Sequence, residues 1–341
     1  MSRKTKPLIT TLLVVIGLVS FVLMHNTSSS SSLNQNPNMQ KPVVIAYQTG
    51  VDPTKVAQAD GDYEAQSQTD INWKKFDTGA DIVNALASGD VDIGNIGTSP
   101  LAAATSRNVP IEVFLTVAKL GASEALVVRN GAGIDQPQDL IGKTIAVPFV
   151  STAHYSLLSA LKHWRISDNQ VKIINLRPSE ISAAWERGDI DATYVWEPAL
   201  SKATETGRVF TDSKQVGEWG APTYDVWVVR KDFAEQHPEF LKSFVKTSLL
   251  QIDLYNQDPK AYVANAENIK KIAELTGSNP KDIPLLLAGN MYLSRDQHIE
   301  TFKADFAKSI LDTAKFLKSQ GKVDALKADY HENVTAEYLQ P

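Results

Sequence analysis

The stretch INWKKFDTGADIVNALASGDVDIGNIGTSP, residues 71–100, has a second copy in KIINLRPSEISAAWERGDIDATYVWEPA, residues 172–199. In each copy a strand leads into a helix. The helix ends at Gly89 or Gly188, the residue type that closes helices in the left-handed conformation. An Asp-x-Asp turn and another apolar strand follow. The two copies lie about a hundred residues apart, a spacing that predicts one duplicated lobe rather than a solenoid of short repeats.

Strands that alternate with helices predict parallel βαβ units and a sheet covered on both faces. VVIAYQTG (43–50) has a counterpart in KTIAVPFVST (143–152), and EALVVRN (124–130) has one in DVWVVRK (225–231). If the chain leaves the first lobe at 124–130 and returns at 225–231, these two strands form the hinge. The expected fold is therefore α/β, with two Rossmann-like lobes joined by two hinge strands.

The expected division of the chain has four parts. They are a signal sequence with a serine-rich linker (1–40), the first part of lobe 1 (41–129), lobe 2 (130–224), and a return to lobe 1 with C-terminal helices (225–341).

The N-terminus is typical of an exported protein. Arg3, Lys4 and Lys6 precede an uncharged apolar run at 7–24, and a polar, serine-rich segment follows it. This order is that of a secretory signal. An uncleaved membrane anchor is the alternative, because the run approaches the length of a spanning helix and no clear small-x-small cleavage site follows. We expect export to the periplasm, with membrane anchoring if the segment is retained.

Composition excludes several classes of function. The chain has 341 residues, 43% hydrophobic and 21% charged, with a net charge of −5, which argues against a nucleic-acid partner. It has no cysteine, and therefore no disulfide, thiolate metal site or thiol nucleophile. Metalloprotease and phosphate-loop motifs do not occur in the sequence. His154 lies near Ser151, but no nucleophile elbow precedes that serine. The sequence predicts neither an enzyme nor a bound metal or cofactor.

Ligands of open α/β sheets bind outside the carboxyl ends of the strands. Across two facing lobes this rule predicts a cleft that closes by hinge bending. The residues at these strand ends in lobe 1 are Tyr47, Gln48, Thr49, Asp77, Thr78, Gly97, Thr98 and Ser99. In lobe 2 they are Phe149, Ser151, Thr152, His154, Arg177, Ser179, Tyr194, Trp196 and Glu197, and the hinge adds Glu124 and Asp225.

The helix that begins near Ser151 suggests an anion site. A helix N-terminus presents free N–H groups and about half a positive charge, and the hydroxyls of Ser151 and Thr152 add donors. Thr98 and Ser99 stand at the same place in lobe 1. The pattern suits a sulfonate, sulfate, phosphate or carboxylate. The alternative is that these hydroxyls only cap their helices. Similarly, Trp196 and Trp219 wall the cleft or pack in the core, and Trp227 is expected in the core because it lies inside a strand.

Several long segments resemble a known family. They are IAYQTG, KKFDTGADIVNALASGDVDIGNIGTSP, IAVPFVSTAHYSLLSALKHW, AAWERGDIDATYVWEPA and GEWGAPTYDVWVVRKDFAEQHPE. In this order, from about residue 43 to the C-terminus, they resemble the periplasmic taurine-binding proteins of ABC transporters. The wider family includes aliphatic sulfonate-binding and nitrate-binding proteins. The resemblance implies the type II periplasmic binding fold, and a protein that captures taurine and delivers it to an inner-membrane permease for use as a sulfur source. We also expect a monomer, because no heptad pattern or exposed apolar helix in the sequence suggests a dimer.

Taurine carries a sulfonate and an ammonium two carbons apart, so the resemblance implies a site with two ends. The residues expected at the sulfonate end are Thr98, Ser99, Ser151, Thr152 and His154. Those expected at the ammonium end are Glu124, Asp225 and Glu197, and those of the cleft wall are Tyr47, Gln48, Asp77, Tyr194, Trp196 and Trp219. Glu197 departs from the pattern, because relatives often carry a small residue there; it joins the ammonium end or faces solvent. Another alkanesulfonate or nitrate is the alternative ligand, and an enzyme of the same two-lobed fold is the more distant one.

Overall fold

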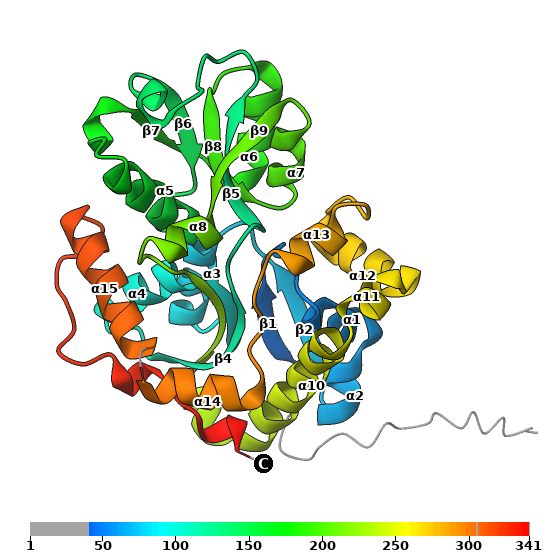
Figure 1. Cartoon of the computed structure of the whole chain (residues 1–341). Coiled ribbons are helices and arrows are strands. Elements are labelled where there is room, and N and C mark those ends of the chain that lie inside the picture. The colour runs from blue at the N-terminus through cyan, green and yellow to red at the C-terminus, as the bar shows by residue number, and fades with distance from the viewer. Residues whose placement is uncertain (1–40, 305, 341) are drawn as a thin grey trace, which may run out of the picture. The chain divides into compact units, whose positions relative to one another are not determined.

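The computed structural model describes residues 41–304 and 306–340. The predicted signal sequence and serine-rich linker lie outside the described residues. Among the residues that are described, no helix has both the length and the apolar character needed to cross a membrane. The secondary structure alternates between strands and helices up to Arg230 and is mostly helical beyond it (Figure 1).

The first sheet has five strands in the order β2-β1-β3-β10-β4. Its strands are β1 (Val43–Tyr47), β2 (Ile71–Lys75), β3 (Ile93–Gly97), β4 (Ile111–Lys119) and β10 (Tyr224–Arg230). β1 pairs in parallel with β2 and β3, as expected for βαβ units. β10 runs antiparallel between β3 and β4. All five residues of β3 are buried, which is the pattern of a central strand covered on both faces.

The second sheet repeats this arrangement in the order β7-β6-β8-β5-β9. Its strands are β5 (Glu124–Arg129), β6 (Thr144–Val147), β7 (Lys172–Asn175), β8 (Ala192–Trp196) and β9 (Gly207–Asp212). β6 pairs in parallel with β7 and β8, and β5 runs antiparallel between β8 and β9. The two sheets therefore confirm the duplication that the sequence predicts.

The resemblance between 124–130 and 225–231 has a structural meaning, because β5 and β10 occupy the same place in the two sheets. Each follows a strand of the opposite sheet in the chain. β5 belongs to the second sheet, so the expectation that lobe 1 extends to residue 129 is wrong on this point. The chain crosses between sheets at 120–123 and again at 213–223, before β10. We propose these two crossings as the lobe boundaries, with residues 124–212 forming the strands and helices of lobe 2 and the other described residues forming lobe 1.

Helices cover both sheets. Those up to the second crossing are α1 (Thr54–Asp60), α2 (Asp62–Ser67), α3 (Gly79–Ser88), α4 (Thr98–Ser106), η1 (Pro137–Leu140), α5 (Thr152–His163), η2 (Asp168–Gln170), α6 (Pro178–Arg187), α7 (Ala199–Thr204) and α8 (Ser213–Glu218). Those after β10 are α9 (Lys231–Gln236), α10 (Pro238–Gln257), α11 (Pro259–Ala264), α12 (Ala266–Thr276), α13 (Ile283–Ala288), α14 (Arg295–Ala304), α15 (Phe306–Ser319), η3 (His331–Asn333) and η4 (Glu337–Leu339).

The repeated helix–turn–strand unit is built alike in both lobes. α3 and α6 end at Gly89 (φ 83°) and Gly188 (φ 79°), both left-handed, as the sequence predicts. The second aspartate of each Asp-x-Asp turn then binds the backbone near the start of β1 or of its equivalent strand, β6. Asp92 accepts from the Val44 N–H at 2.9 Å, and Asp191 accepts from the Thr144 N–H at 2.8 Å. Both aspartates therefore have a structural role, because each carboxylate binds a backbone N–H of a sheet strand.

The C-terminal helices do more than cover lobe 1. α10 packs on α1 and α2, and α15 packs on α4, as expected for a return to lobe 1. The α12–α13 region also reaches the second sheet's lobe, where Asp282 accepts from Ser201 Oγ at 3.2 Å.

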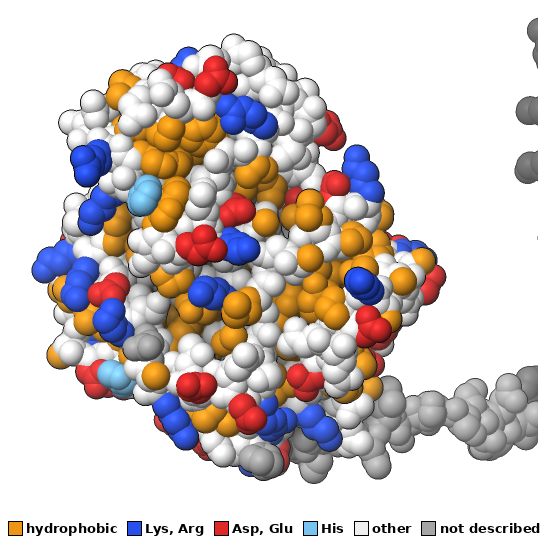
Figure 2. All heavy atoms as spheres, viewed as in Figure 1, with side chains coloured by type: hydrophobic (Ala, Val, Ile, Leu, Met, Phe, Trp, Pro, Cys, Tyr) orange, Lys and Arg blue, Asp and Glu red, His pale blue; other side chains and the backbone are white. Residues whose placement is uncertain are grey.

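On the face seen in Figure 2, Lys and Arg side chains are interspersed with Asp and Glu. This face therefore lacks the continuous basic surface of a nucleic-acid binder.

Candidate functional site

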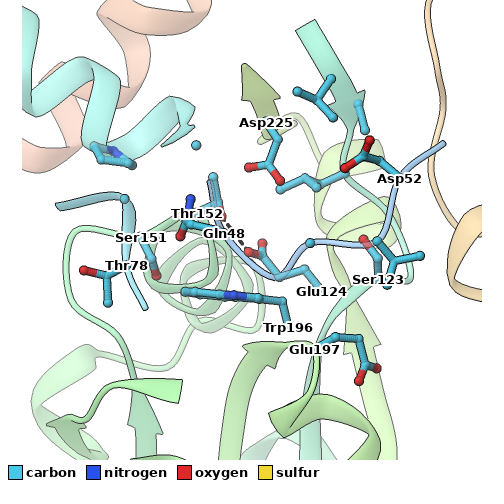
Figure 3. A pocket seen from close by; sticks show the side chains of 18 of the residues that line it. Gln48, Asp52, Thr78, Ser123, Glu124, Ser151, Thr152, Trp196, Glu197 and Asp225 are labelled. Atoms are coloured by element: carbon cyan, nitrogen blue, oxygen red, sulfur yellow. Dashed lines mark hydrogen bonds between the residues drawn. The ribbon is translucent and has the colours of Figure 1, made fainter. Parts of the chain in front are cut away.

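A cavity lies between the carboxyl ends of the strands of both sheets, and Figure 3 shows many of the side chains around it. It is lined by Gln48, Gly50, Val51, Asp52, Thr78, Gly79, Ala80, Gly97, Pro100, Val117, Ala118, Leu120, Ser123, Glu124, Phe149, Val150, Ser151, Thr152, Trp196, Glu197, Asp225 and Asn290. The centres of water molecules can occupy about 40 Å³ of it. This is room for a few waters or one very compact molecule.

The N-terminus of α5 holds a carboxyl group of the protein itself. Thr152 Oγ1 donates to Glu124 Oε2 at 2.5 Å, and Ser213 Oγ donates to Glu124 Oε1 at 2.8 Å. The Ala153 N–H also binds this carboxyl. Burial raises the pKa of Glu124 to about 8 against the effect of these donors, and the charge of Asp225 adds to the rise. The first turn of α5 thus already has a carboxyl partner, before any ligand binds.

Ser151 is the N-cap of α5. Its hydroxyl accepts from the His154 N–H at 3.1 Å and donates to the Pro148 carbonyl at 2.6 Å. Its one proton is therefore used inside the protein. Both hydrogen bonds of this hydroxyl are those of a helix cap, which is the alternative that the sequence left open. The residue nevertheless lines the cavity.

The N-terminus of α3 faces the cavity from the first lobe. Thr78 Oγ1 caps the Asp81 N–H at 3.3 Å. Gly79 and Ala80, which line the cavity, have N–H groups with no hydrogen-bond partner among the described residues. Beside them, one N–H of the Gln48 amide donates to the Asn95 carbonyl at 3.0 Å, so the amide is held while its second N–H remains available. This end of the cavity is rich in donors.

The other end is acidic. Figure 3 shows the carboxyls of Asp225 and Glu124 pointing toward the same space from opposite sides. Burial raises the pKa of Asp225 to about 7; the charge of Asp52 raises it further and that of Lys55 lowers it. Asp52 itself is paired with the buried ammonium of Lys55 at 3.4 Å and accepts from the Thr54 N–H at 2.8 Å. Among the described residues, Asp225 therefore has neither a paired cation, as Asp52 has, nor hydrogen-bond donors, as Glu124 has.

Equivalent strand pairs place the two facing carboxyls. Asp225 is paired with Gly97 where β10 meets β3, and Glu124 is paired with Trp196 where β5 meets β8. The duplicated sheets thus put one acidic residue at the same position of each lobe. Because the crossings bring these two positions together, the acids face each other across the cavity.

Several contacts join the two lobes around the cavity. Thr49 Oγ1 donates to the Glu197 carbonyl at 2.7 Å. At the exposed edge, Arg177 pairs with Asp81 at 3.0 Å, and Ser179 Oγ donates to Asp77 at 3.0 Å. A Cβ at Gly97 would lie 2.6 Å from Thr152 Cγ2, so the lobes approach closely there. The structure therefore has the two lobes in contact.

Seven of the residues expected at the site line the cavity: Gln48, Glu124, Ser151, Thr152, Trp196, Glu197 and Asp225. Seven others lie elsewhere, which corrects their predicted positions. Thr98 and Ser99 are buried within α4, and Thr98 accepts from the Tyr224 N–H at 3.4 Å. The His154 ring stacks on Phe149 with centroids 4.6 Å apart, and burial lowers its pKa to about 4.

The remaining four corrections concern the expected wall. Tyr47 packs edge-on against Trp73 at 6.2 Å in the core of the first lobe. Tyr194 is buried in the second sheet, with its hydroxyl 3.1 Å from Ser213 Oγ. Asp77 is exposed at the edge of the lobes, and Trp219 stacks on His163 at 3.9 Å in a separate surface groove. Of the aromatic residues expected in the wall, only Trp196 lines the cavity among the described residues. The others pack in the cores or on the surface, so an aromatic residue near a strand end does not by itself indicate the cleft.

Sequence reasoning also missed cavity residues. Gly79 and Ala80 follow the strand end at Asp77 and Thr78, which the sequence predicts. The structure shows that Thr78 caps α3, so the N–H groups of Gly79 and Ala80 are the free donors of the first turn. Asn290 comes from the C-terminal helices and accepts from the Gly121 N–H at 3.0 Å and from Ser123 Oγ at 2.7 Å. Nothing local in the sequence signals Asn290, because its partners are 169 and 167 residues away.

Comparison with known proteins agrees with this architecture. Residues 41–259 match the model of the substrate-binding domain of ABC-type glycine betaine transport systems. The chain is 55% identical over 298 residues, 87% of its length and 92% of the relative's, to the taurine-binding periplasmic protein of Escherichia coli K12. It is 28% identical, over 89% of its length and 88% of the relative's, to a putative aliphatic sulfonates-binding protein of Bacillus subtilis 168.

The fold is also that of a solved structure. The alkanesulfonate-binding protein of Xanthomonas axonopodis pv. citri, bound to MOPS, has a TM-score of 0.69 at 23% identity, over 86% of this chain and 98% of that chain. The mixed two-sheet fold of periplasmic binding proteins is therefore the fold of this chain.

The hydrogen bonds of Glu124 can be tested through stability. Ser213→Ala removes the donor at 2.8 Å and leaves a buried acceptor unsatisfied, which should cost about 1–3 kcal/mol in the free energy of unfolding. Because the pKa of Glu124 is raised, its carboxyl is neutral well below pH 8 and ionised above it, where a missing donor costs more. We expect the deficit of the variant, measured by urea unfolding, to grow between pH 6 and pH 9.

Ser182→Ala is the matched control, since its hydroxyl bonds only the Pro178 carbonyl within α6. A Ser213→Ala deficit that is absent, or that stays the same at both pH values, would contradict the role assigned to this carboxyl.

Proposed function

This chain belongs to the substrate-binding proteins of ABC-type transport systems, and on that premise we propose that it captures taurine in the periplasm and delivers it to a membrane permease. The observation that carries the proposal is the polarity of the cavity, which has hydrogen-bond donors at one end and an unpaired carboxyl at the other. A compact zwitterion with its anion and cation at opposite ends complements both. The high identity to a taurine-binding relative supports the same ligand.

The sulfonate is proposed to bind between Gln48 and the N-terminus of α3. Three donors converge there: the N–H groups of Gly79 and Ala80 and the free N–H of the Gln48 amide. The positive end of the α3 dipole adds to the attraction. The tip of α5 contributes less than its sequence suggests, because Thr152 and Ala153 already bind Glu124.

The ammonium is proposed to bind between Asp225 and Glu124. An ammonium there supplies the counter-charge that Asp225 lacks, since Lys55 is already paired with Asp52. Ethanesulfonate would leave the acidic end without a cation, and nitrate would leave much of the cavity empty. Glu197 is not assigned to this end, because its side chain points away from the space between the other two carboxyls (Figure 3).

Delivery requires that the lobes open and close, and we infer a hinge at the two crossings, 120–123 and 213–223. The lobe-to-lobe contacts of Thr49, Arg177 and Ser179 support a closed form around the ligand. We propose a monomer, because the duplication already supplies both halves of the site within one chain. Export to the periplasm is proposed from the basic, apolar and polar order of residues 1–40, and the periplasmic relative agrees with it.

An enzyme of the same fold is the less favoured alternative. The hydroxyl of Ser151 donates to a carbonyl, and His154 is stacked on Phe149 with its Nδ1 3.4 Å from the Val150 N–H. Neither is positioned as a nucleophile–base pair, which needs the two side chains hydrogen-bonded to each other. A turnover screen in which taurine bound to the protein is consumed would favour the enzyme.

Calorimetry with taurine and ethanesulfonate tests the function, and Asp225→Asn tests the ammonium end. The wild-type protein should bind taurine more tightly than ethanesulfonate. Asp225→Asn keeps the shape of the side chain but removes its charge, which should cost taurine about 2–4 kcal/mol, the scale for truncating one partner of a buried charge pair. Ethanesulfonate should bind the variant as well as before or better. Equal weakening of both ligands would contradict the assignment.

Gln48→Ala tests the sulfonate end. The variant loses a donor to a charged group, worth about 1.5–3 kcal/mol, which corresponds to roughly tenfold to 150-fold in affinity. Because both ligands carry the sulfonate, taurine and ethanesulfonate should weaken together, in contrast to the selective effect of Asp225→Asn. Unchanged affinity for both would show that the sulfonate binds elsewhere.

Gly97→Ala tests closing. The new Cβ would lie 2.6 Å from Thr152 Cγ2 on the opposite lobe, and overpacking of this kind costs about 1–3 kcal/mol. We expect weaker taurine binding in calorimetry with little change in the melting temperature of the empty protein. Thr152→Ser removes the clashing methyl while it keeps the hydroxyl that binds Glu124, so the double variant should recover affinity. A single variant that binds normally, or a double variant that is not rescued, would argue against this contact in the bound form.

A further inference from the structure

One hydroxyl on α7 lies between two carboxyls. Ser201 Oγ is 2.9 Å from Glu197 Oε1 and 3.2 Å from Asp282 Oδ2. Glu197 follows β8 in the second sheet's lobe, whereas Asp282 precedes α13, one of the C-terminal helices assigned above to lobe 1 (Figure 1). A serine hydroxyl has a single proton, so it can donate to only one of the two acceptors at a time. The bridge is therefore one proton short if both carboxyls are ionised.

No Lys or Arg of the described residues pairs with Glu197. The residue is only 2% exposed, and its Oε2 is shielded from water and has no partner within the described part of the chain. On α7, Lys202 pairs with Glu186 at 3.0 Å and with Glu205 at 3.5 Å. From the α12–α13 side the charged group is Asp282, and from the β1 side Thr49 meets only the Glu197 backbone. Because the oxygen is covered by protein, a hydrated metal ion has no access to it.

The bridge also depends on the contact between lobes. Thr49 Oγ1 bonds the Glu197 carbonyl at 2.7 Å from the first lobe, and a Cβ at Gly277 would touch Pro198 Cγ at 3.8 Å. If the lobes separate, water reaches Glu197, and Asp282 moves away from it. The charged form of the carboxyl is then favoured again.

We propose that closing around the ligand takes up a proton, which the Glu197–Ser201–Asp282 bridge holds between the two lobes. This inference rests on the proposed function, because it requires that a ligand closes the lobes. In the protonated bridge, Ser201 donates to one carboxyl, and the added proton on Glu197 removes the repulsion between the two acids. Binding at this site is thereby coupled to pH through a residue that does not contact the ligand's charged groups.

The sign of the effect follows from the environments of Glu197. Burial, reinforced by the charge of Asp282, raises the pKa of Glu197 to about 7 in the closed form, against the hydrogen bonds from Ser201. In the open, hydrated form we expect the ordinary value, near 4.5. A raised pKa makes closing most favourable below the lower value and progressively less so as pH rises through about 7. Between pH 6 and pH 8 this coupling should weaken taurine binding by about tenfold.

Calorimetry of taurine binding in buffers of different ionisation enthalpy measures the proton uptake directly. Near pH 6 the wild-type protein should take up close to one more proton than Glu197→Gln, whose amide mimics the neutral acid. From pH 6 to pH 8 the wild type should lose about tenfold in taurine affinity relative to Glu197→Gln, because only the wild type has a carboxyl that ionises at this position. The comparison between variants cancels the titration of Asp225 and Glu124, which both proteins share. Glu205→Gln, which changes an exposed carboxylate on the same lobe, is the matched control and should behave as the wild type.

Asp282→Asn provides a second, independent variant. Removing the like charge should lower the pKa of Glu197 in the closed form, so proton uptake near pH 6 should fall without abolishing binding. Equal uptake in wild type and Glu197→Gln, or an affinity ratio that is constant with pH, would overturn the inference while leaving taurine binding intact. If neither protein binds taurine at any pH, the proposed function fails, and the inference falls with it because no ligand closes the lobes.

Discussion

The hydrogen bonds around the Glu124 carboxyl connect the parts of the second lobe on which the site depends. Glu124 begins β5, directly after the first crossing, and binds Thr152 at the tip of α5 and Ser213 at the start of α8. One side chain therefore holds the entering strand, a cavity helix and the segment that leaves the lobe. The same bonds use the donors of the α5 tip. The opposite lobe has Asp225 at the equivalent strand position, but without such donors, so one carboxyl is satisfied internally and the other is left for a cation.

The exchange of β5 and β10 between the two sheets determines how the chain connects the lobes. Each sheet needs an antiparallel strand that arrives from the opposite lobe, so two chain segments must cross between them. The first crossing is packed tightly. A Cβ at Gly121 would lie 1.9 Å from the Gly289 carbonyl oxygen, and Asn290 binds both Gly121 and Ser123. This packing fixes one of the two crossings proposed as the hinge, and it brings Asn290 from the C-terminal helices to the cavity.

Four acidic residues line the cavity, and their surroundings give them different properties. Asp52 is paired with Lys55, and Glu124 is held by hydroxyl and backbone donors. Asp225 is unpaired at the end proposed for the ammonium, and Glu197 turns away to share Ser201 with Asp282. Burial raises the pKa of the last three, to about 8, 7 and 7 in that order. The number of acidic residues therefore does not give the charge of the site, because the burial and partners of each carboxyl determine whether it is ionised.

The sequence by itself determined the duplicated α/β design, the glycine ends of α3 and α6, and the strand ends where the cavity lies, because these follow from local periodicity and backbone preference. It also located Glu124 and Asp225, since they lie in the first two positions of strands that resemble each other. Tertiary structure alone decided which sheet receives β5, that the donors of α5 bind Glu124, and that Thr98, Ser99 and His154 lie outside the cavity. It also brought Asn290 and Asp282 to their partners. These contacts join residues far apart in the chain, and strand exchange and long-range packing leave no periodic or local trace in the sequence.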